Sequence, residues 1–242
     1  MRAFVALVAY SLKASVPPRR RVGLLVPCAA AILFGAIART FGGDASHHFG
    51  EVAAAALFGL VLPVTTLVIG DAVLGAEIRR GSFTFTWLSP VPTWQVVVAR
   101  WIGGSAIAAG SLALAFSISA LVAGTPDSVG PVALGAAFGA MAYVAVFMAI
   151  GSIAQRAAVW SLAFVFLVER LLGAALSGIA QISPSWEARS VFTGMAEVAD
   201  SMERSGVPDG GAAVVRLLMI TALGLAVAAW RLPRLRMVGS SD

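Results

Sequence analysis

Two charged residues, Glu169 and Arg170, stand in the middle of a long apolar run that extends from about residue 157 to residue 180. A charged group at the centre of a bilayer costs at least about 2.5–3.5 kcal/mol, so it is expected to have a partner or to face a wet cavity. Adjacent residues on a helix point roughly 100° apart, which prevents direct pairing of the two side chains. Glu169 and Arg170 are therefore candidates for a transport pathway, and the alternative is a structural lock between helices.

Asp71, near the inner end of an earlier apolar run, is the third candidate for the pathway, and its alternative role is a polar anchor at a helix end. The only histidines, His47 and His48, stand beside Asp44 and Glu51. Adjacent side chains diverge and no other histidine or cysteine is near them in the sequence, so no metal site is predicted. The same inventory disfavours membrane-embedded proteolysis, which needs a histidine within a span or histidines at helical spacing.

The only lysine, Lys13, follows no glycine-rich loop. A loop that holds nucleotide phosphates needs glycines ahead of a Lys-Ser or Lys-Thr pair at the start of a helix. The chain is therefore predicted not to be an enzyme, not to hydrolyse ATP by itself and to hold no cofactor.

The composition is that of a membrane protein. Of the 242 residues 59% are hydrophobic and only 12% are charged, and the mean hydropathy is +0.90, whereas soluble domains are about 45–50% apolar and about 25% charged. Backbone groups in hydrocarbon must pair within a helix or a closed barrel, and the long runs of Ala, Leu, Val and Gly favour helices. The net charge of +5 comes from basic clusters beside apolar runs, a pattern of membrane orientation rather than of nucleic-acid binding. The single cysteine, Cys28, excludes an intrachain disulfide.

We expect an all-α, polytopic membrane protein in which residues 1–242 form one transmembrane domain. A span needs about 20 mostly apolar residues. Six spans are predicted, at about 22–38, 52–74, 101–123, 132–153, 157–180 and 212–230. Residues 1–21 are predicted as a cytoplasmic interfacial segment, and residues 1–16 as a helix on the membrane surface; a frayed terminus is the alternative. The predicted apolar face of that helix consists of Phe4, Leu7, Val8 and Leu12.

The arginines and lysines give the orientation. If the N-terminus is inside, 12 of the 17 basic residues fall in inside segments, and eight of the 12 acidic residues fall outside. Cytoplasmic loops carry the excess of Lys and Arg, so both termini are predicted to be cytoplasmic, and residues 39–50 and 124–131 are predicted as short outer turns. The predicted location is the plasma membrane, with a bacterial cell membrane favoured by composition.

Two segments carry further patterns. In the extracellular segment 181–211, a helix is predicted from Pro184-Ser185 to about Gly206 as a short cap on the outer side. Its predicted apolar face consists of Val191, Met195, Val198 and Met202. In the fourth span, Gly135 and Gly139 form a small-x-x-x-small pair that favours close packing against a neighbouring helix.

Residues 75–100 are predicted as an inner segment of unusual composition. Residues 70–101 contain, in order, Asp71, Glu77, Arg79-Arg80, Gly81-Ser82, Ser89-Pro90 and Arg100, with the aromatic residues Phe83, Phe85, Trp87 and Trp94 among them. Gly81 allows a sharp turn, and Ser82 can cap the helix that follows. The aromatic residues are too apolar for a solvated loop, so they are expected to bury against lipid headgroups, the bundle or another protein.

This stretch resembles the inner loop of type-2 ABC transporter permeases. In that family an acidic residue and a basic pair end the second span, a short apolar helix and a Ser-Pro turn follow, and a basic residue leads into the third span. The resemblance implies a membrane-spanning subunit of an exporter that pairs with a second permease chain, as a homodimer or heterodimer. It also implies a separate ATP-binding cassette ATPase, which binds ATP and magnesium. The residues that would couple to that ATPase are Glu77, Arg79, Arg80, Gly81, Ser82, Phe83, Phe85, Trp87 and Pro90.

Two other functions stay open from the residues alone. One is an ion-coupled secondary transporter with Glu169 and Asp71 as proton sites. The other is a membrane anchor or assembly protein that transports nothing. A carrier does not need an aromatic inner helix, and an anchor does not need charges in the middle of the membrane. Membrane lipid is an expected partner in every case, and nucleic acid is not.

Overall fold

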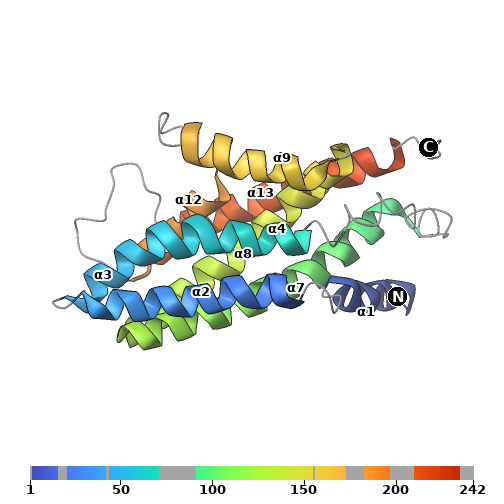
Figure 1. Cartoon of the computed structure of the whole chain (residues 1–242). Coiled ribbons are helices and arrows are strands. Elements are labelled where there is room, and N and C mark those ends of the chain that lie inside the picture. Colours follow the sequence, from blue (N-terminus) through green and yellow to red (C-terminus); the bar gives the residue numbers. More distant parts are fainter. Residues whose placement is uncertain are drawn as a thin grey trace.

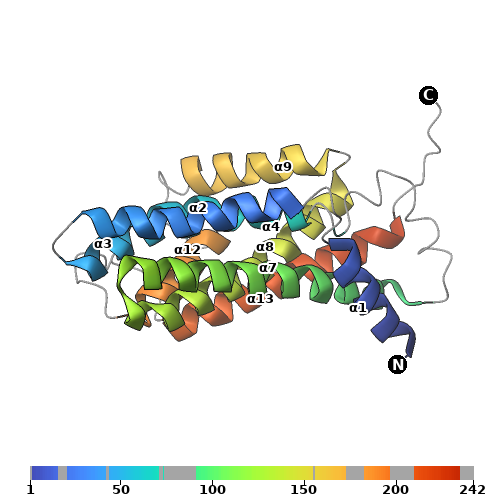
Figure 2. The same cartoon turned by 60° about the horizontal axis from the view of Figure 1, so that its bottom comes forward.

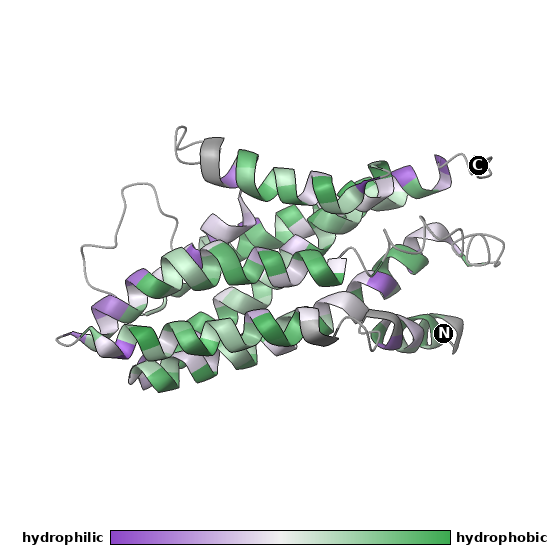
Figure 3. Ribbon diagram, in the orientation of Figure 1, coloured by the Kyte–Doolittle hydropathy of each residue, from purple (hydrophilic) through white to green (hydrophobic). Residues whose placement is uncertain are grey.

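The computed structural model describes residues 2–15, 21–41, 44–70, 73, 91–154, 156–172, 183–196 and 210–234. These parts of the chain are helices joined by short turns and contain no strand (Figure 1). Five helical stretches are long and apolar enough to cross a membrane, namely Gly23–Thr40, Ala45–Gly70, Thr93–Ala123, Pro126–Ile153 and Gly210–Arg234. Most hydrophilic residues lie near the helix ends (Figure 3). The predicted all-α class is thus confirmed for the described residues, and the five long apolar helices are compatible with a polytopic membrane protein.

The α-helices are α1 (Arg2–Ser15), α2 (Arg21–Thr40), α3 (Ala45–Val52), α4 (Leu62–Gly70), α7 (Thr93–Ala123), α8 (Val129–Ile153), α9 (Ala157–Ala163), α12 (Pro184–Thr193) and α13 (Gly210–Arg231). Two π-helical segments, η2 (Ala53–Val61) and η5 (Phe164–Leu172), continue α3 and α9 without a break. Two 3-10 turns, η4 (Pro126–Ser128) and η7 (Leu232–Arg234), stand before α8 and after α13.

Successive long helices run in alternating directions along the bundle (Figures 1 and 2). Helix α1 and turn η7 lie at one end, which we call the terminal end. The end of α2, the start of α3 and the junction of α7 with η4 lie at the other end, which we call the turn end. Both ends of the described chain therefore lie on one side of the bundle.

The second long helix begins earlier than its hydropathy predicts. Asp44 caps it, because Asp44 Oδ1 accepts hydrogen bonds from the backbone N–H of Ser46 at 3.0 Å and of His47 at 3.4 Å. The hydrogen bond from the Ser46 side chain, followed by those from these two backbone groups, lowers the pKa of Asp44. The capped helix runs from Ala45 through η2 to Gly70 and α2 extends to Thr40, so the predicted outer turn at 39–50 is too long at both ends. His47 and His48 belong to its first turn, where a cap offsets the cost of polar residues.

Helix α7 also starts before its predicted bound at residue 101. It begins at Thr93, directly after Pro92, whose extended backbone ends the preceding segment. It ends at Gly124, which has φ 87°, a left-handed conformation that glycine adopts without steric cost. The predicted inner segment 75–100 thus contains two turns of this helix, including the exposed Trp94 and the buried Arg100.

Helix α8 forms the centre of the bundle, packed against α4, α7, α12 and α13. Its neighbours approach closely because small residues line it. A Cβ on Gly139 would lie 2.7 Å from the Cβ of Ala188, and one on Gly135 would lie 2.6 Å from the carbonyl oxygen of Ala188. The predicted close packing of this glycine pair is confirmed, and the partners are the short helix α12 and the second long helix, through Phe58 and Leu62.

Helix α12 is not a cap on the surface, as the sequence predicts, but a wedge inside the bundle. It begins at Pro184 as predicted and ends at Thr193, far short of Gly206. Ala188, Val191 and Phe192 are fully buried. Met195 follows the helix and is exposed, so its predicted place on the apolar face is wrong. Val198 and Met202 lie outside the described residues.

Helices α9 and η5 form one continuous rod at the edge of the bundle (Figures 1 and 2). The predicted fifth span, 157–180, is described only as far as Leu172. Ala157, Ser161, Val165 and Glu169 face the bundle at a spacing of four residues. Val159, Trp160, Leu162, Phe166 and Leu167 are exposed.

Helix α1 packs along α7. A Cβ on Gly103 would lie 2.5 Å from the Cβ of Ser11, so the two helices touch at this point. Of the helix predicted over residues 1–16, Arg2–Ser15 is confirmed as helical, and its place on the membrane surface stays a prediction. Phe4, Leu7 and Val8 of its predicted face are partly buried, but Leu12 is exposed and Ser11 is buried, so the packed face is turned away from Leu12.

Candidate functional site

The predicted coupling segment lies almost entirely outside the described residues. This applies to Glu77, Arg79, Arg80, Gly81, Ser82, Phe83, Phe85, Trp87 and Pro90, and also to Asp71 and to the side chain of Arg170. The structure does describe where the segment leaves and re-enters the bundle. Val73 is buried and packs against Gly104, and Thr93 begins α7 at the terminal end (Figure 1).

Arg100 lies in the first turns of α7 and contacts Val73. Its side chain is only 1% exposed, although the sequence suggests a basic residue at a helix entrance. One guanidinium N–H donates to the backbone oxygen of Val73 at 3.5 Å, and the guanidinium carbon lies 4.9 Å from the ring centroid of Tyr10. Arg100 therefore joins α7 to helix α1 and to the residue that follows the second long helix. Hydropathy carries no signal for this contact, because it depends on where α1 packs.

Glu169 is the centre of a polar cluster formed by three helices. Its side chain is 9% exposed. Its Oε2 accepts a short hydrogen bond from the hydroxyl of Tyr143 on α8 and one of 3.2 Å from Ser185 on α12. Ser185 in turn shares a hydrogen bond of 2.8 Å with Ser183. The cluster links the edge rod α9–η5 to the central helix and to the wedge helix.

The second carboxylate oxygen of Glu169 is buried and has no hydrogen-bond partner among the described residues. A buried oxygen of this kind is costly, because it has given up water without gaining a donor. Glu169 also lies in a π-helical segment, a local structure that is frequent at functional sites. The prediction that Glu169 finds a partner on another helix is confirmed, and the partners are hydroxyls.

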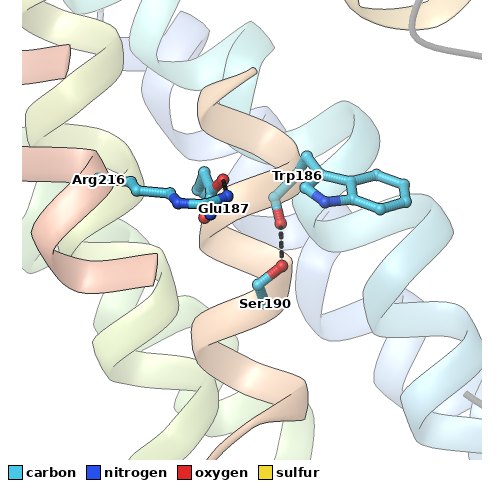
Figure 4. Close-up of polar contacts among 4 residues, drawn as sticks. All are labelled: Trp186, Glu187, Ser190 and Arg216. Carbon is cyan, nitrogen blue, oxygen red and sulfur yellow. Dashed lines mark hydrogen bonds and ion pairs between the residues drawn. The ribbon is translucent and has the colours of Figure 1, made fainter. Parts of the chain in front are cut away.

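A second buried carboxylate lies on the wedge helix (Figure 4). Glu187 is fully buried, and its Oε1 accepts a hydrogen bond of 3.1 Å from Arg216 on α13, which is 39% exposed. Its Oε2 has no partner within the part of the chain that the structure describes. Burial raises the pKa of Glu187, and the hydrogen bond and charge of Arg216 act against that rise. The ion pair holds α12 against α13.

The sequence suggests unconnected roles for Glu187 and Arg216, as an acid of the outer segment and as an arginine at the edge of a span. They are 29 residues apart, and no local pattern predicts which acid meets which base.

Phe192 fixes the other end of the wedge. Its ring centroid lies 6.2 Å from that of Phe49 and 5.8 Å from that of Phe58, which in turn lies 5.6 Å from Phe116. Aromatic pairs at such distances stabilise by about 0.5–1.5 kcal/mol beyond their buried area. Helix α12 is therefore held by rings, by glycine contacts and by two carboxylates.

The comparisons with known proteins give no family. No protein-family model matches the chain, and no curated protein matches its sequence.

The chemistry of the site follows from its geometry alone. Both carboxylates involve helix α12. Glu169 on η5 accepts a hydrogen bond from Ser185 of α12, and Glu187 is a residue of α12 itself. Each has one oxygen that is satisfied and one that, among the described residues, is open to a proton or to a hydrogen-bond donor. Such an arrangement can bind protons or donor groups and can couple that binding to the position of α12.

Proposed function

We propose that this chain is the membrane-spanning permease subunit of an ATP-binding cassette transporter, and that it exports its substrate with the power of a separate ATPase subunit. In this proposal the chain has six spans with both termini in the cytoplasm. Ala157–Leu172 is the described part of the fifth span. Two permease chains, identical or related, pair in the plasma membrane.

The proposal rests on the resemblance of the aromatic segment and on the described residues that flank it. Val73 and Thr93, the described residues on either side of most of that segment, lie toward the terminal end, where Arg100 joins Val73 to α1. The bias of basic residues predicts that this end faces the cytoplasm, where a soluble ATPase would bind. The residues of the segment resemble the coupling loop of type-2 ABC permeases. A permease subunit needs its coupling segment on the side of the membrane where the ATPase binds, and the described residues that flank this segment lie toward that side.

The first test is purification of the chain with the ATPases encoded near its gene. We expect one ATPase to copurify, and we expect its ATP hydrolysis to change when the permease is present. The double substitution Arg79→Glu/Arg80→Glu should uncouple hydrolysis from transport without changing thermal unfolding. Arg39→Glu, which changes an exposed arginine at the turn end, is the matched control. Transport that is unchanged by the double substitution would contradict the coupling role.

The orientation has a test of its own. Cys28 is the only cysteine, so Cys28→Ala gives a cysteine-free background. A cysteine placed at Gly81 should resist an impermeant thiol reagent on intact cells and react after permeabilisation. Reaction on intact cells would contradict both the orientation and the contact with an ATPase.

A second candidate function is an ion-coupled secondary transporter, and the open oxygen of Glu169 is the observation that favours it. A carrier of this kind would accumulate substrate in vesicles without ATP, driven by a proton gradient. Glu169→Gln should then abolish accumulation, whereas Ser161→Ala, two turns earlier on the same buried strip, should not. ATP-free accumulation would support the carrier and remove the ABC proposal.

A further inference from the structure

Exposed aromatic side chains gather at the terminal end of the bundle. Tyr10, Trp94, Trp160 and Trp230 are each between 54% and 61% exposed. They come from four different helices, α1, α7, α9 and α13, and each stands in the part of its helix at the terminal end (Figure 1). Rings of this kind belong at the level of lipid headgroups, where one side is apolar and the other is wet.

Basic residues accompany these rings. Lys13, Arg156 and Arg234 are exposed and Arg231 is partly exposed. The guanidinium carbon of Arg234 lies 4.1 Å from the ring centroid of Trp230, and one of its N–H groups donates to the backbone oxygen of that residue at 3.4 Å. We call the four aromatic and four basic residues the aromatic–basic belt.

The turn end differs in its charge. Within the described ranges, the aspartates and glutamates are Asp44, Glu51, Asp127, Glu169 and Glu187. The first three lie in or near α3 and η4 at the turn end, and the last two belong to the polar cluster around α12. The belt therefore has no described acid beside it, and it presents a positive field to whatever covers it.

We propose that the aromatic–basic belt binds the phosphate groups of anionic phospholipids. Phosphate accepts hydrogen bonds from guanidinium groups, which present several donors in a fixed plane. The Trp230 ring fixes Arg234 by stacking, so less side-chain freedom is lost when a phosphate binds. The other rings supply apolar contact with the upper acyl chains. The proposal is independent of ATP-driven transport, because it needs only a membrane and this end of the bundle.

The test uses the full-length chain in lipid nanodiscs, together with its ATPase if one copurifies. Tryptophan fluorescence is quenched with brominated phosphatidylglycerol or with brominated phosphatidylcholine at equal mole fraction. We expect the anionic lipid to quench more strongly, with an apparent preference of roughly fivefold or more, because each basic residue near a charged surface contributes about 1 kcal/mol. The preference should decrease as salt is added.

Arg156→Gln/Arg231→Gln/Arg234→Gln should reduce this preference to near equality, and all tryptophans stay in place. Arg39→Gln is the matched control, since Arg39 lies in the last turn of α2 at the turn end, as Arg231 does in the last turn of α13 at the terminal end. The single exposed substitution Arg234→Gln gives a smaller loss and serves if the triple variant does not fold. Inorganic phosphate in place of anionic lipid should not protect the tryptophans from quenching by the zwitterionic lipid.

Three results would overturn the proposal. The first is equal quenching of the unsubstituted chain by the two lipids. The second is the same loss in Arg39→Gln as in the single variant Arg234→Gln, which would mean that only total charge matters. The third is a triple variant that keeps its lipid preference but no longer copurifies with an ATPase, which would make the belt a protein-binding surface.

Discussion

Helix α8 and the rod formed by α9 and η5 are both apolar, but they have opposite places in the bundle. Fourteen residues of α8 are buried, among them Tyr143 and Phe147, and helices pack around it. The rod buries one narrow strip and exposes Trp160 and Phe166. Hydropathy predicts both as spans and does not distinguish them. The difference lies in residue size, because glycine and alanine along α8 let neighbours approach, whereas large residues cover the rod.

The largest effect should come from filling a glycine contact on α8. Gly139→Leu places a side chain where a Cβ alone would lie 2.7 Å from Ala188 and 2.9 Å from Leu62. We expect a loss of about 3 kcal/mol or more, because overpacking forces helix α12 away from α8. The measurement is unfolding by heat or denaturant in one detergent. Gly130→Leu is the matched control on the same helix, since no described atom lies within 4 Å of a Cβ there.

If Gly130→Leu destabilised the chain as strongly as Gly139→Leu, the effect would come from the loss of glycine itself and not from the contact with α12.

The second-largest effect should come from removal of an aromatic ring, and it should differ between α8 and the rod. Phe147 on α8 is 2% exposed and its ring centroid lies 5.4 Å from that of Tyr143. Phe147→Ala leaves a cavity that the surrounding helices fill only in part, at a cost of about 3 kcal/mol, the lower end of the range for a buried phenylalanine. Phe166→Ala, on the exposed side of the rod, should cost less than about 1 kcal/mol, because little of its surface is buried in the bundle. Equal losses in thermal unfolding would show that the rod is packed in the membrane, for instance against a second chain.

The sequence predicts these helices better than it predicts the site between them. The long apolar runs, the start of α12 at Pro184 and the glycine pair on α8 all follow from local patterns of residue type. The start of the second long helix does not, because hydropathy does not register the Asp44 cap. The end of α12 is missed as well, because a spacing of four and three residues continues past Gly194, where the helix ends.

Contacts between distant helices cannot be predicted from this sequence, and the reason is physical. Glu169 meets a hydroxyl 26 residues before it, and Glu187 meets an arginine 29 residues after it. Each pairing depends on how α12 is inserted among three other helices. A sequence shows that a buried charge needs a partner, but only the packing decides which partner that is.

The ion pair of the wedge helix gives a third, smaller effect that depends on pH. Arg216→Gln leaves Glu187 buried without its cation, and we expect a loss of about 1–2 kcal/mol at neutral pH, since Arg216 is partly exposed. A raised folded-state pKa contributes stability at acidic pH that is lost as the pH rises through it. Without Arg216 the pKa of Glu187 rises further, so the variant should lose more stability from acidic to neutral pH than the unsubstituted chain does.

Unfolding midpoints at acidic and neutral pH measure this difference. Adding Glu187→Gln to Arg216→Gln removes the titrating group, so the extra pH dependence should disappear. If it persisted in the double variant, another group would be responsible.

The smallest effect should come from loss of the hydrogen bond between Tyr143 and Glu169, which we call the tether of the rod. Tyr143→Phe removes the donor from α8 and leaves Glu169 with its hydrogen bond from Ser185, so we expect a loss of about 1 kcal/mol, the usual net worth of one hydrogen bond. Because the rod buries only a narrow strip, the loss should appear as local opening of the rod. The substitution Ser161→Cys, at a buried position, reports that opening through the rate at which the new thiol reacts with a thiol reagent.

The rod and the central helix should respond differently to the loss of this one hydroxyl. The thiol introduced by Ser161→Cys should react faster when Tyr143→Phe is added, whereas the thiol introduced by Ala140→Cys, at a buried position on α8, should react as slowly as before. Both substitutions are measured in the Cys28→Ala background. If both thiols reacted faster, α8 and the rod would open as one cooperative unit. The hydrogen bond of Tyr143 would then have no special role in holding the rod. If only the rod opens, Glu169 is the polar attachment that holds an otherwise loosely packed helix to the wedge.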